Sequence, residues 1–144
     1  MSFPTPKPGL VVRYSYLWRS DHLRGQEEGV KDRPCAVLLA VTNEDGEVNV
    51  LVLPITHTPP ANLADAVEIP AATKRRLGLD DERSWIVLTE SNRFKWPGPD
   101  LRPAKSGDAS SVAYGELPSD LFKKMKGKWL ARIDAHRSIV PRSE

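Results

Sequence analysis

The sequence predicts an α+β fold in which mainly antiparallel strands fill the first two-thirds of the chain and a helix follows them. Three observations support this prediction. Two apolar, β-rich runs flank a turn signal, short strand-like runs recur on both sides of them, and an amphipathic helical pattern comes last. Because hairpins and irregular loops join short strands, we expect antiparallel pairing in a small, strongly bent sheet or partly closed barrel, with a short inserted helix and a C-terminal helix.

The strongest hairpin signal lies in the first half of the chain. Two apolar runs, residues 35–42 and 48–55, flank the turn sequence Glu-Asp-Gly-Glu. Antiparallel pairing of these runs would bring the two ends of the hairpin together. We therefore expect a guanidinium from Arg33, a hydroxyl from Thr56 and an imidazole from His57 at one edge of the sheet.

The remaining elements follow from shorter patterns. Further strands are expected where β-branched and aromatic residues cluster, at residues 10–16, 65–69 and 84–89. A helix is expected at residues 71–77, because Pro70 suits a first helical turn and Gly78 suits a helix end. A longer helix is expected over residues 119 to about 134, where apolar residues recur on one face. Loops are expected in two segments rich in charge, glycine or proline, residues 20–32 and 96–115.

The whole chain, residues 1–144, is expected to form one domain, with a core at about residues 8–135 and a short irregular C-terminal tail. The single cysteine, Cys35, lies in an apolar run, which favours a buried thiol and excludes a disulfide within one chain. No apolar run reaches the ~20 residues of a membrane span, and the N-terminus lacks the apolar core of a signal peptide. We therefore expect a soluble cytoplasmic protein.

The net charge of +2 is unremarkable, but the basic excess lies toward the C-terminus. Four lysines of the expected last helix carry most of it: Lys123, Lys124, Lys126 and Lys128. Such a group can bind phosphate backbones, and it can equally form the solvated face of a helix. The sequence leaves both interpretations open.

Several common catalytic signatures are absent from the sequence. No glycine-rich phosphate loop precedes a helix, and no GxSxG elbow occurs. The single cysteine and the three histidines, His22, His57 and His136, show no metal-ligand spacing. We therefore expect chemistry without a metal or cofactor, carried by arginine, threonine, histidine and carboxylate side chains.

Five short segments resemble, in the same order, segments of the MazF/PemK family of toxins from bacterial toxin–antitoxin modules. They are PGLVV at residues 8–12, KDRPCAVL at 31–38, VLPIT at 52–56, SWIVL at 84–88 with the following Glu90 and Arg93, and LP at 117–118. The resemblance runs through most of the chain. One departure is that the segment between the first two of these motifs is longer than is typical of the family.

The resemblance implies an SH3-like small barrel that forms a homodimer. It also implies a metal-independent endoribonuclease that cleaves single-stranded RNA, leaves a 2′,3′-cyclic phosphate and a 5′-hydroxyl, and is restrained by a cognate antitoxin protein. The matching segments make Arg33 and Thr56 the main catalytic positions. They make Glu90 and Arg93 positions that act in some members.

This chemistry agrees with the missing motifs, because cyclising cleavage uses the 2′-hydroxyl of the RNA itself as the nucleophile. We expect Arg33 to stabilise the charge that develops around phosphorus and Thr56 to donate a hydrogen bond to a non-bridging oxygen. Either His57 or Glu90 would handle protons. The candidate RNA-binding residues are Arg24, Lys31, Arg93 and Trp96.

Each candidate residue also has a structural interpretation. Arg33 could form an ion pair with Asp32 or Glu90 at the start of its strand. Glu90 and Arg93 could pair structurally across the loop, and Thr56 could simply end its strand. His57 could be a surface or packing residue, and Trp96 could cover the mouth of the barrel. Three functions therefore stay open: an RNA-cleaving toxin, a non-catalytic SH3-like module that binds protein or RNA, and a gyrase-targeting member of the superfamily. The Arg33 and Thr56 pair favours the first.

Overall fold

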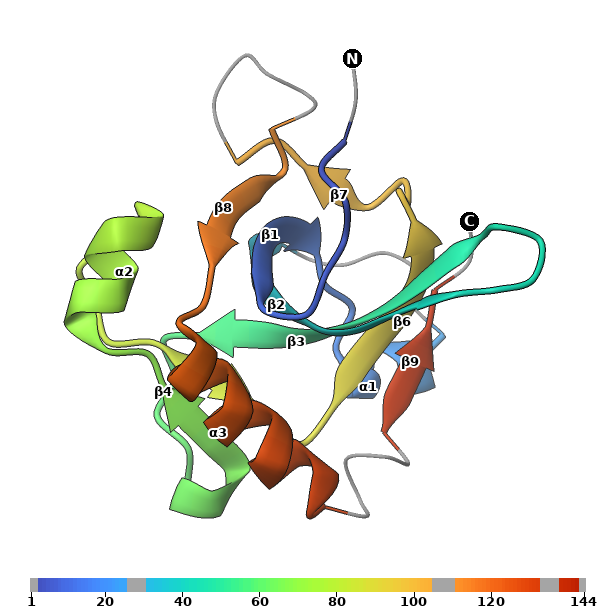
Figure 1. The fold of residues 1–144 in the computed structure, drawn as a ribbon. Helices are drawn as coiled ribbons and strands as arrows, with labels where there is room; N and C mark the ends of the chain where they lie inside the picture. Colours follow the sequence, from blue (N-terminus) through green and yellow to red (C-terminus); the bar gives the residue numbers. More distant parts are fainter. Residues whose placement is uncertain (1–2, 26–30, 105–110, 133–137, 143–144) are drawn as a thin grey trace.

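A computed structural model describes residues 3–25, 31–104, 111–132 and 138–142 of the chain (Figure 1). The strands are β1 Leu10–Ser15, β2 Asp32–Thr42, β3 Val48–Thr56, β4 Ala66–Glu68, β5 Trp85–Val87, β6 Ser91–Trp96, β7 Leu101–Arg102, β8 Ala113–Glu116 and β9 Ile139–Pro141. The helices are α1 Arg19–Leu23, α2 Ala71–Leu77 and α3 Ser119–Leu130, with a 3₁₀ turn at Leu63–Asp65. The fold is α+β with mainly antiparallel strands, as the sequence predicts.

The β2–β3 hairpin is the centre of the sheet, and its position confirms the strongest prediction from the sequence. Its antiparallel pairing runs from Cys35 opposite Pro54 as far as the turn. In the turn, Gly46 has a φ of 87°, a left-handed conformation that favours glycine. A register shift within β2 marks a bulge, which bends the strand and increases its twist.

The hairpin joins the other described strands into one sheet. The strand order is β4-β5-β3-β2-β1-β7, and β6, β8 and β9 pair with β3, β1 and β6, respectively. The β6–β9 pair is parallel, and the other pairs are antiparallel. In the described part of the chain the sheet curls without closing (Figure 1), so it forms a partly open barrel.

Two hydrophobic cores bury both faces of the central strands. In β3, Leu51 and Leu53 belong to one core, and Val50 and Val52 belong to the other. Helix α3 packs on the first core through three buried side chains, Leu121, Met125 and Trp129. Because successive side chains of a strand point to opposite faces, burial on both sides makes β2 and β3 continuous apolar runs in the sequence.

Two helices follow their sequence signals closely. Helix α2 has the predicted bounds, and Gly78 ends it with a φ of 71°. Helix α3 begins at the predicted Ser119 and ends at Leu130, a few residues before the predicted end. Among the helices that the structure describes, none has the length and apolar character needed to cross a membrane.

The single cysteine has the buried environment that the sequence predicts. Cys35 lies in the second core with 0% of its surface exposed. Burial raises the pKa of its thiol, because the low-dielectric interior disfavours the thiolate. The thiol therefore stays protonated at neutral pH and serves as a small apolar group.

Three stretches that were expected to be irregular contain regular structure, so this expectation is wrong for them. Most of helix α1 lies in the segment 20–32, β7 and most of β8 lie in the segment 96–115, and β9 lies in the C-terminal tail. Strand β6 was also not expected. Its polar residue Asn92 is buried because it accepts a hydrogen bond from the Leu17 N–H at 2.9 Å and donates one to the Leu17 carbonyl at 2.8 Å.

The residue that follows β9 places a charged side chain in the interior. The Arg142 side chain is 3% exposed, and its Nη2 lies 3.0 Å from the Asp100 carboxylate. Its Nη1 donates to the Ser15 carbonyl at 2.8 Å, to Asn92 Oδ1 at 3.0 Å and to the Tyr14 hydroxyl at 3.2 Å. These bonds connect β9 to β1 across the sheet and satisfy a polar group that would otherwise be costly to bury.

Candidate functional site

A pocket of about 450 Å³ opens where the hairpin strands β2 and β3 have their free ends, beside helix α2. Its lining comes from the start of β2, the end of β3, and α2 with the segment after it, and includes Lys31, Arg33, Thr56, His57, Lys74 and Asp80. Antiparallel pairing therefore brings Arg33, Thr56 and His57 to one place, as the hairpin geometry predicts. Lys31, a predicted RNA-binding residue, lines the same pocket.

Arg33 is half-buried, and only weak contacts hold its guanidinium. The guanidinium carbon lies 4.9 Å from the centre of the Trp18 ring, a cation–π arrangement. Nη1 lies 3.5 Å from the Ile55 carbonyl oxygen, at the long limit of a hydrogen bond. Nε is buried and has no hydrogen-bond partner in the described residues. Because an unsatisfied buried donor is unfavourable, the guanidinium keeps the capacity to bind an anion.

The two carboxylates that the sequence offers as partners of Arg33 have other partners. Asp32 lies 3.9 and 3.6 Å from nitrogens of two other arginines, Arg13 and Arg102. Glu90 accepts hydrogen bonds from the Tyr16 hydroxyl at 3.1 Å and from the Arg19 backbone N–H at 2.8 Å. The interpretation of Arg33 as an ion-pair partner of Asp32 or Glu90 is therefore wrong. Within the described ranges no carboxylate pairs with Arg33.

Thr56 is the last residue of β3 and is half-buried. Its register partner is Trp85 of β5, which fixes the backbone at this position. The Thr56 hydroxyl oxygen accepts a hydrogen bond from the Thr58 N–H at 3.2 Å. A hydroxyl can donate as well as accept, so this contact orients the group and leaves its hydrogen free to bind an acceptor in the pocket.

A second pocket of about 410 Å³ adjoins the first, because Thr56 and Thr58 line both. Its lining is mainly apolar and includes Trp18, Pro59, Pro60, Ala66 and Val87. Trp18 thus touches Arg33 of the first pocket and also lines the second. An aromatic ring beside an unpaired guanidinium is an arrangement that allows a base to stack next to a bound phosphate.

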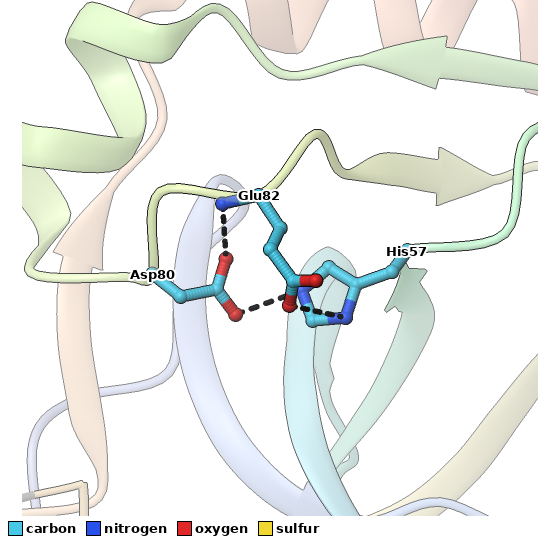
Figure 2. A group of neighbouring side chains, drawn as sticks. All are labelled: His57, Asp80 and Glu82. Carbon is cyan, nitrogen blue, oxygen red and sulfur yellow. Dashed lines mark hydrogen bonds and ion pairs between the residues drawn. The ribbon is translucent and has the colours of Figure 1, made fainter.

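His57 contacts two carboxylates that come from the segment between α2 and β5, one with each ring nitrogen (Figure 2). Its Nε2 is 2.7 Å from Asp80 Oδ2, within hydrogen-bond distance. Its Nδ1 is 3.5 Å from Glu82 Oε2, which is an ion-pair distance only if the ring is protonated. The Glu82 side chain is 68% exposed, so this second contact is the weaker of the two.

Lys74 of α2 holds Asp80 in this arrangement. Its side chain is 5% exposed, and Nζ lies 2.5 Å from Asp80 Oδ1 and 2.6 Å from the Ser84 hydroxyl. The hydrogen bond from Lys74 is the main reason that the pKa of Asp80 is lowered; partial burial opposes it, and the hydrogen bond with His57 adds to it. An ionised carboxylate can only accept hydrogen bonds, so Nε2 of His57 carries the proton.

The atoms of His57, Asp80 and Glu82 that could bind a metal lie within 4.8 Å of one another. Imidazole and carboxylate are ligands that divalent metal ions accept, and the spacing in the sequence did not predict this grouping. The ammonium of Lys74 on Asp80 already supplies a positive charge here and would repel a divalent ion. We therefore interpret the group as a hydrogen-bonded chain from Lys74 through Asp80 to His57.

Glu90, the second candidate for proton transfer, does not line the pocket of Arg33 and Thr56. Its carboxylate is oriented toward Tyr16 and the Arg19 N–H. Burial raises the pKa of Glu90, and these two hydrogen bonds oppose the rise. Among the described residues, no ion pair joins it to Arg93, so their suggested pairing is not observed.

The other predicted RNA-binding residues also lie away from this pocket. Arg93 is an exposed residue of β6. Trp96, at the end of the same strand, is half-buried with its ring centre 6.1 Å from that of Phe94. Arg24 is exposed after α1 and pairs with Asp21. The pocket therefore collects four of the eight predicted site residues and leaves Glu90 and these three outside it.

Nothing in the sequence pattern singles out Lys74 or Asp80 as site residues. Lys74 begins a run of three basic residues in α2, and Asp80 begins an acidic run after it. Both runs indicate a solvated surface when only neighbouring residues are considered. The signal lies in the fold, which packs the end of α2 against the end of β3.

The fold and the site together define a small α+β protein with a partly open antiparallel barrel and a cation-rich pocket at the end of its central hairpin. No family model matches the sequence. The chain is 31% identical over 86 residues to Arginase 2, chloroplastic/mitochondrial, of Arabidopsis thaliana, a stretch that covers 59% of this chain and 25% of that protein. Because the chain spans a quarter of the length of that protein, the likeness assigns neither a family nor an activity.

Proposed function

We propose that this protein is the toxin of a type II toxin–antitoxin module and acts as a metal-independent endoribonuclease on single-stranded RNA. The observation that carries the proposal is the pocket shared by Arg33 and Thr56, in which Arg33 has no carboxylate partner among the described residues. These are the two residues that the resemblance to the MazF/PemK family makes catalytic. A guanidinium beside a hydroxyl suits the recognition of a phosphodiester.

The proposed reaction starts with attack of an RNA 2′-oxygen on the adjacent phosphorus. The bond from the 2′-oxygen to phosphorus forms, and the bond from phosphorus to the 5′-oxygen breaks. The products are a 2′,3′-cyclic phosphate and a 5′-hydroxyl. Arg33 binds the non-bridging oxygens as their charge grows, and Thr56 donates a hydrogen bond to one of them.

Proton transfer is assigned to His57, because it lines the pocket and Glu90 does not. With Nε2 protonated and bonded to Asp80, the neutral ring has its lone pair on Nδ1, which accepts the 2′-hydroxyl proton. The resulting imidazolium lies between the carboxylates of Asp80 and Glu82, which stabilise its charge. The 5′-oxygen takes up a proton from water as it leaves, and the imidazolium of His57 then returns the first proton to the solvent.

The partners belong to the same proposal and rest on the resemblance. They are a cognate antitoxin protein that restrains cleavage and a second copy of the chain in a homodimer, both acting in the cytoplasm where RNA is translated. Light scattering on the pure protein tests the dimer, and a monomer at micromolar concentration that cleaves RNA at the full rate would remove it from the proposal.

The activity is tested by incubating the pure protein with single-stranded RNA of mixed sequence in EDTA and mapping the ends of the products. We expect cyclic-phosphate and 5′-hydroxyl ends, and no cut at a position with a 2′-deoxy nucleotide. The His57→Gln variant should cleave about 100-fold more slowly, because positioned acid–base groups typically contribute 10²–10⁴-fold. Its affinity for a 2′-O-methyl oligonucleotide, which cannot react, should equal that of the wild type.

Three other outcomes would each contradict a different part of the proposal. Intact RNA, together with growth-neutral expression, would favour the non-catalytic binding module. Cuts at 2′-deoxy positions would exclude the 2′-hydroxyl as nucleophile, and a fully active His57→Gln variant would remove the histidine from the mechanism.

A further inference from the structure

A third pocket continues from the two already described. It has a volume of about 350 Å³ and lies between the segment after β3 and helix α3. Pro59, Pro60 and Ala66 line both the second pocket and the third. Thr56 and Thr58 line both the first pocket and the second, so the three pockets adjoin in series through shared lining residues, and we call this series the groove.

The far end of this groove carries unpaired positive charge. Lys124 and Lys128 are four positions apart on α3, hence on one face, and both line the third pocket. In the part of the chain that the structure describes, neither forms an ion pair. Arg83 of the same pocket is neutralised by two hydrogen bonds to Glu68, at 2.7 and 2.8 Å. Unpaired cations therefore lie at both ends, with Arg33 at the other.

The middle of the groove has a different character. Trp18, Pro59 and Pro60 present ring and apolar surfaces between the two charged ends. A single-stranded nucleic acid combines negatively charged phosphates with flat bases that stack on such surfaces. An acidic peptide would match the cations but would leave this middle section without a complementary group.

We propose that single-stranded RNA lies along this groove from Arg33 to Lys124 and Lys128, so that the two lysines bind phosphates remote from the cleaved bond. The proposal rests on the proposed function, because it places the cleaved phosphate at Arg33. The proposal separates the four lysines of α3 into two pairs. Lys124 and Lys128 contact RNA, whereas Lys123 and Lys126 do not line the groove and belong to the solvated face.

The test compares two double variants of equal charge. Lys124→Gln with Lys128→Gln removes the groove lysines, and Lys123→Gln with Lys126→Gln is the matched control on the same helix. Fluorescence anisotropy measures binding of a 2′-O-methyl oligonucleotide of about 12 nucleotides, a length within the range of single-strand sites. The slope of log affinity against log salt should fall in magnitude by about 1.4 for the groove variant, because each lost phosphate contact removes about 0.7. The control should keep the wild-type slope.

Cleavage gives an independent readout. For a long RNA the groove variant should show a higher KM with an unchanged kcat, and a dinucleotide, which cannot reach α3, should be cleaved as by the wild type. Equal slopes for the two double variants, no binding by the wild type, or equal competition by a poly-glutamate peptide would overturn the proposal. If the slopes differ as expected but the wild type cleaves nothing, the groove stands and the enzyme proposal fails.

Discussion

Arg33 and Arg142 both lie over aromatic rings and differ in what else they contact. The guanidinium carbon of Arg33 is 4.9 Å from the centre of the Trp18 ring, and that of Arg142 is 5.4 Å from the centre of the Tyr14 ring. Arg142 also donates to three oxygen acceptors and pairs with Asp100. Arg33 has one long hydrogen bond and a buried Nε without a partner in the described residues.

The difference separates an arginine that holds the fold together from one that is available to a ligand. The oxygens that accept from Arg142 belong to the protein, so removal of this side chain takes a partner from the buried Ser15 carbonyl and leaves the Asp100 carboxylate without its arginine. The free protein loses little stability when the Arg33 side chain is removed, because few contacts depend on it. Its N–H groups without a partner are instead available to donate hydrogen bonds to a bound anion.

The largest expected effect is on stability, at Arg142. We expect Arg142→Met to lower the free energy of unfolding by about 3–5 kcal/mol, because breaking a buried pair leaves an uncompensated charge. Urea unfolding measures the loss, and the fraction that stays folded should cleave RNA at the wild-type rate. Arg142→Lys keeps the charge with fewer donors, so its free energy of unfolding should lie between those of the wild type and Arg142→Met. A free energy of unfolding equal to that of the wild type would contradict the structural role.

Arg33 should show the opposite behaviour. We expect Arg33→Ala to lower the cleavage rate by about 10²–10³-fold, the usual cost of one donor to a developing oxyanion, and to change stability by no more than about 1 kcal/mol, the most that its cation–π contact contributes. Quantified RNA cleavage and urea unfolding check both parts. Arg33→Lys should recover part of the rate, because it keeps a charge without the planar fork. If Arg33→Ala destabilises the protein as much as Arg142→Met, the comparison fails.

The ring under Arg33 should have a smaller effect. A cation–π contact at a partly exposed site contributes about 0.5–1 kcal/mol, so Trp18→Leu should weaken binding of a 2′-O-methyl oligonucleotide about 2–5-fold. Fluorescence anisotropy measures the change. Trp18→Phe keeps a ring and should bind nearly as well as the wild type, and equal weakening in both variants would rule out stacking as the reason.

The smallest effect is expected at Glu90, the carboxylate that does not reach Arg33. Burial raises its pKa in the folded protein, so its contribution to stability is present below the ordinary glutamate pKa and is lost as the pH rises through the raised value. Glu90→Gln, which cannot ionise, should therefore be the more stable protein at neutral pH, with the difference vanishing below about pH 4. Urea unfolding at several pH values checks this. A less stable variant at neutral pH would mean that the bonds from Tyr16 and Arg19 outweigh burial.

The sequence predicts the strands and helices that are formed by apolar patterns within a short stretch of chain. The β2–β3 hairpin and α2 carry periodicity, turn residues and end signals that act within a few positions. Strands β6 and β9 could not be found in this way. Asn92 of β6 and Arg142, the residue after β9, are buried and polar, and their hydrogen-bond partners lie far away in the chain.

The candidate site likewise has one part that the sequence predicts and one part that it does not. Arg33, Thr56 and His57 meet because a hairpin brings its ends together, which follows from the sequence alone. The support of His57 by Asp80 and Lys74 depends on how α2 packs against β3. The unpaired state of Arg33 depends on which way its neighbouring carboxylates turn, and no local pattern encodes that direction.

The bond between Arg142 and the Tyr14 hydroxyl joins residues that are 128 positions apart. A chain must close that whole loop before such a contact contributes, so contacts of this range form late in folding. An interaction that is absent from the folding transition state slows unfolding and leaves the folding rate nearly unchanged. We therefore expect β9 to set how long the folded barrel persists, and not how fast it forms.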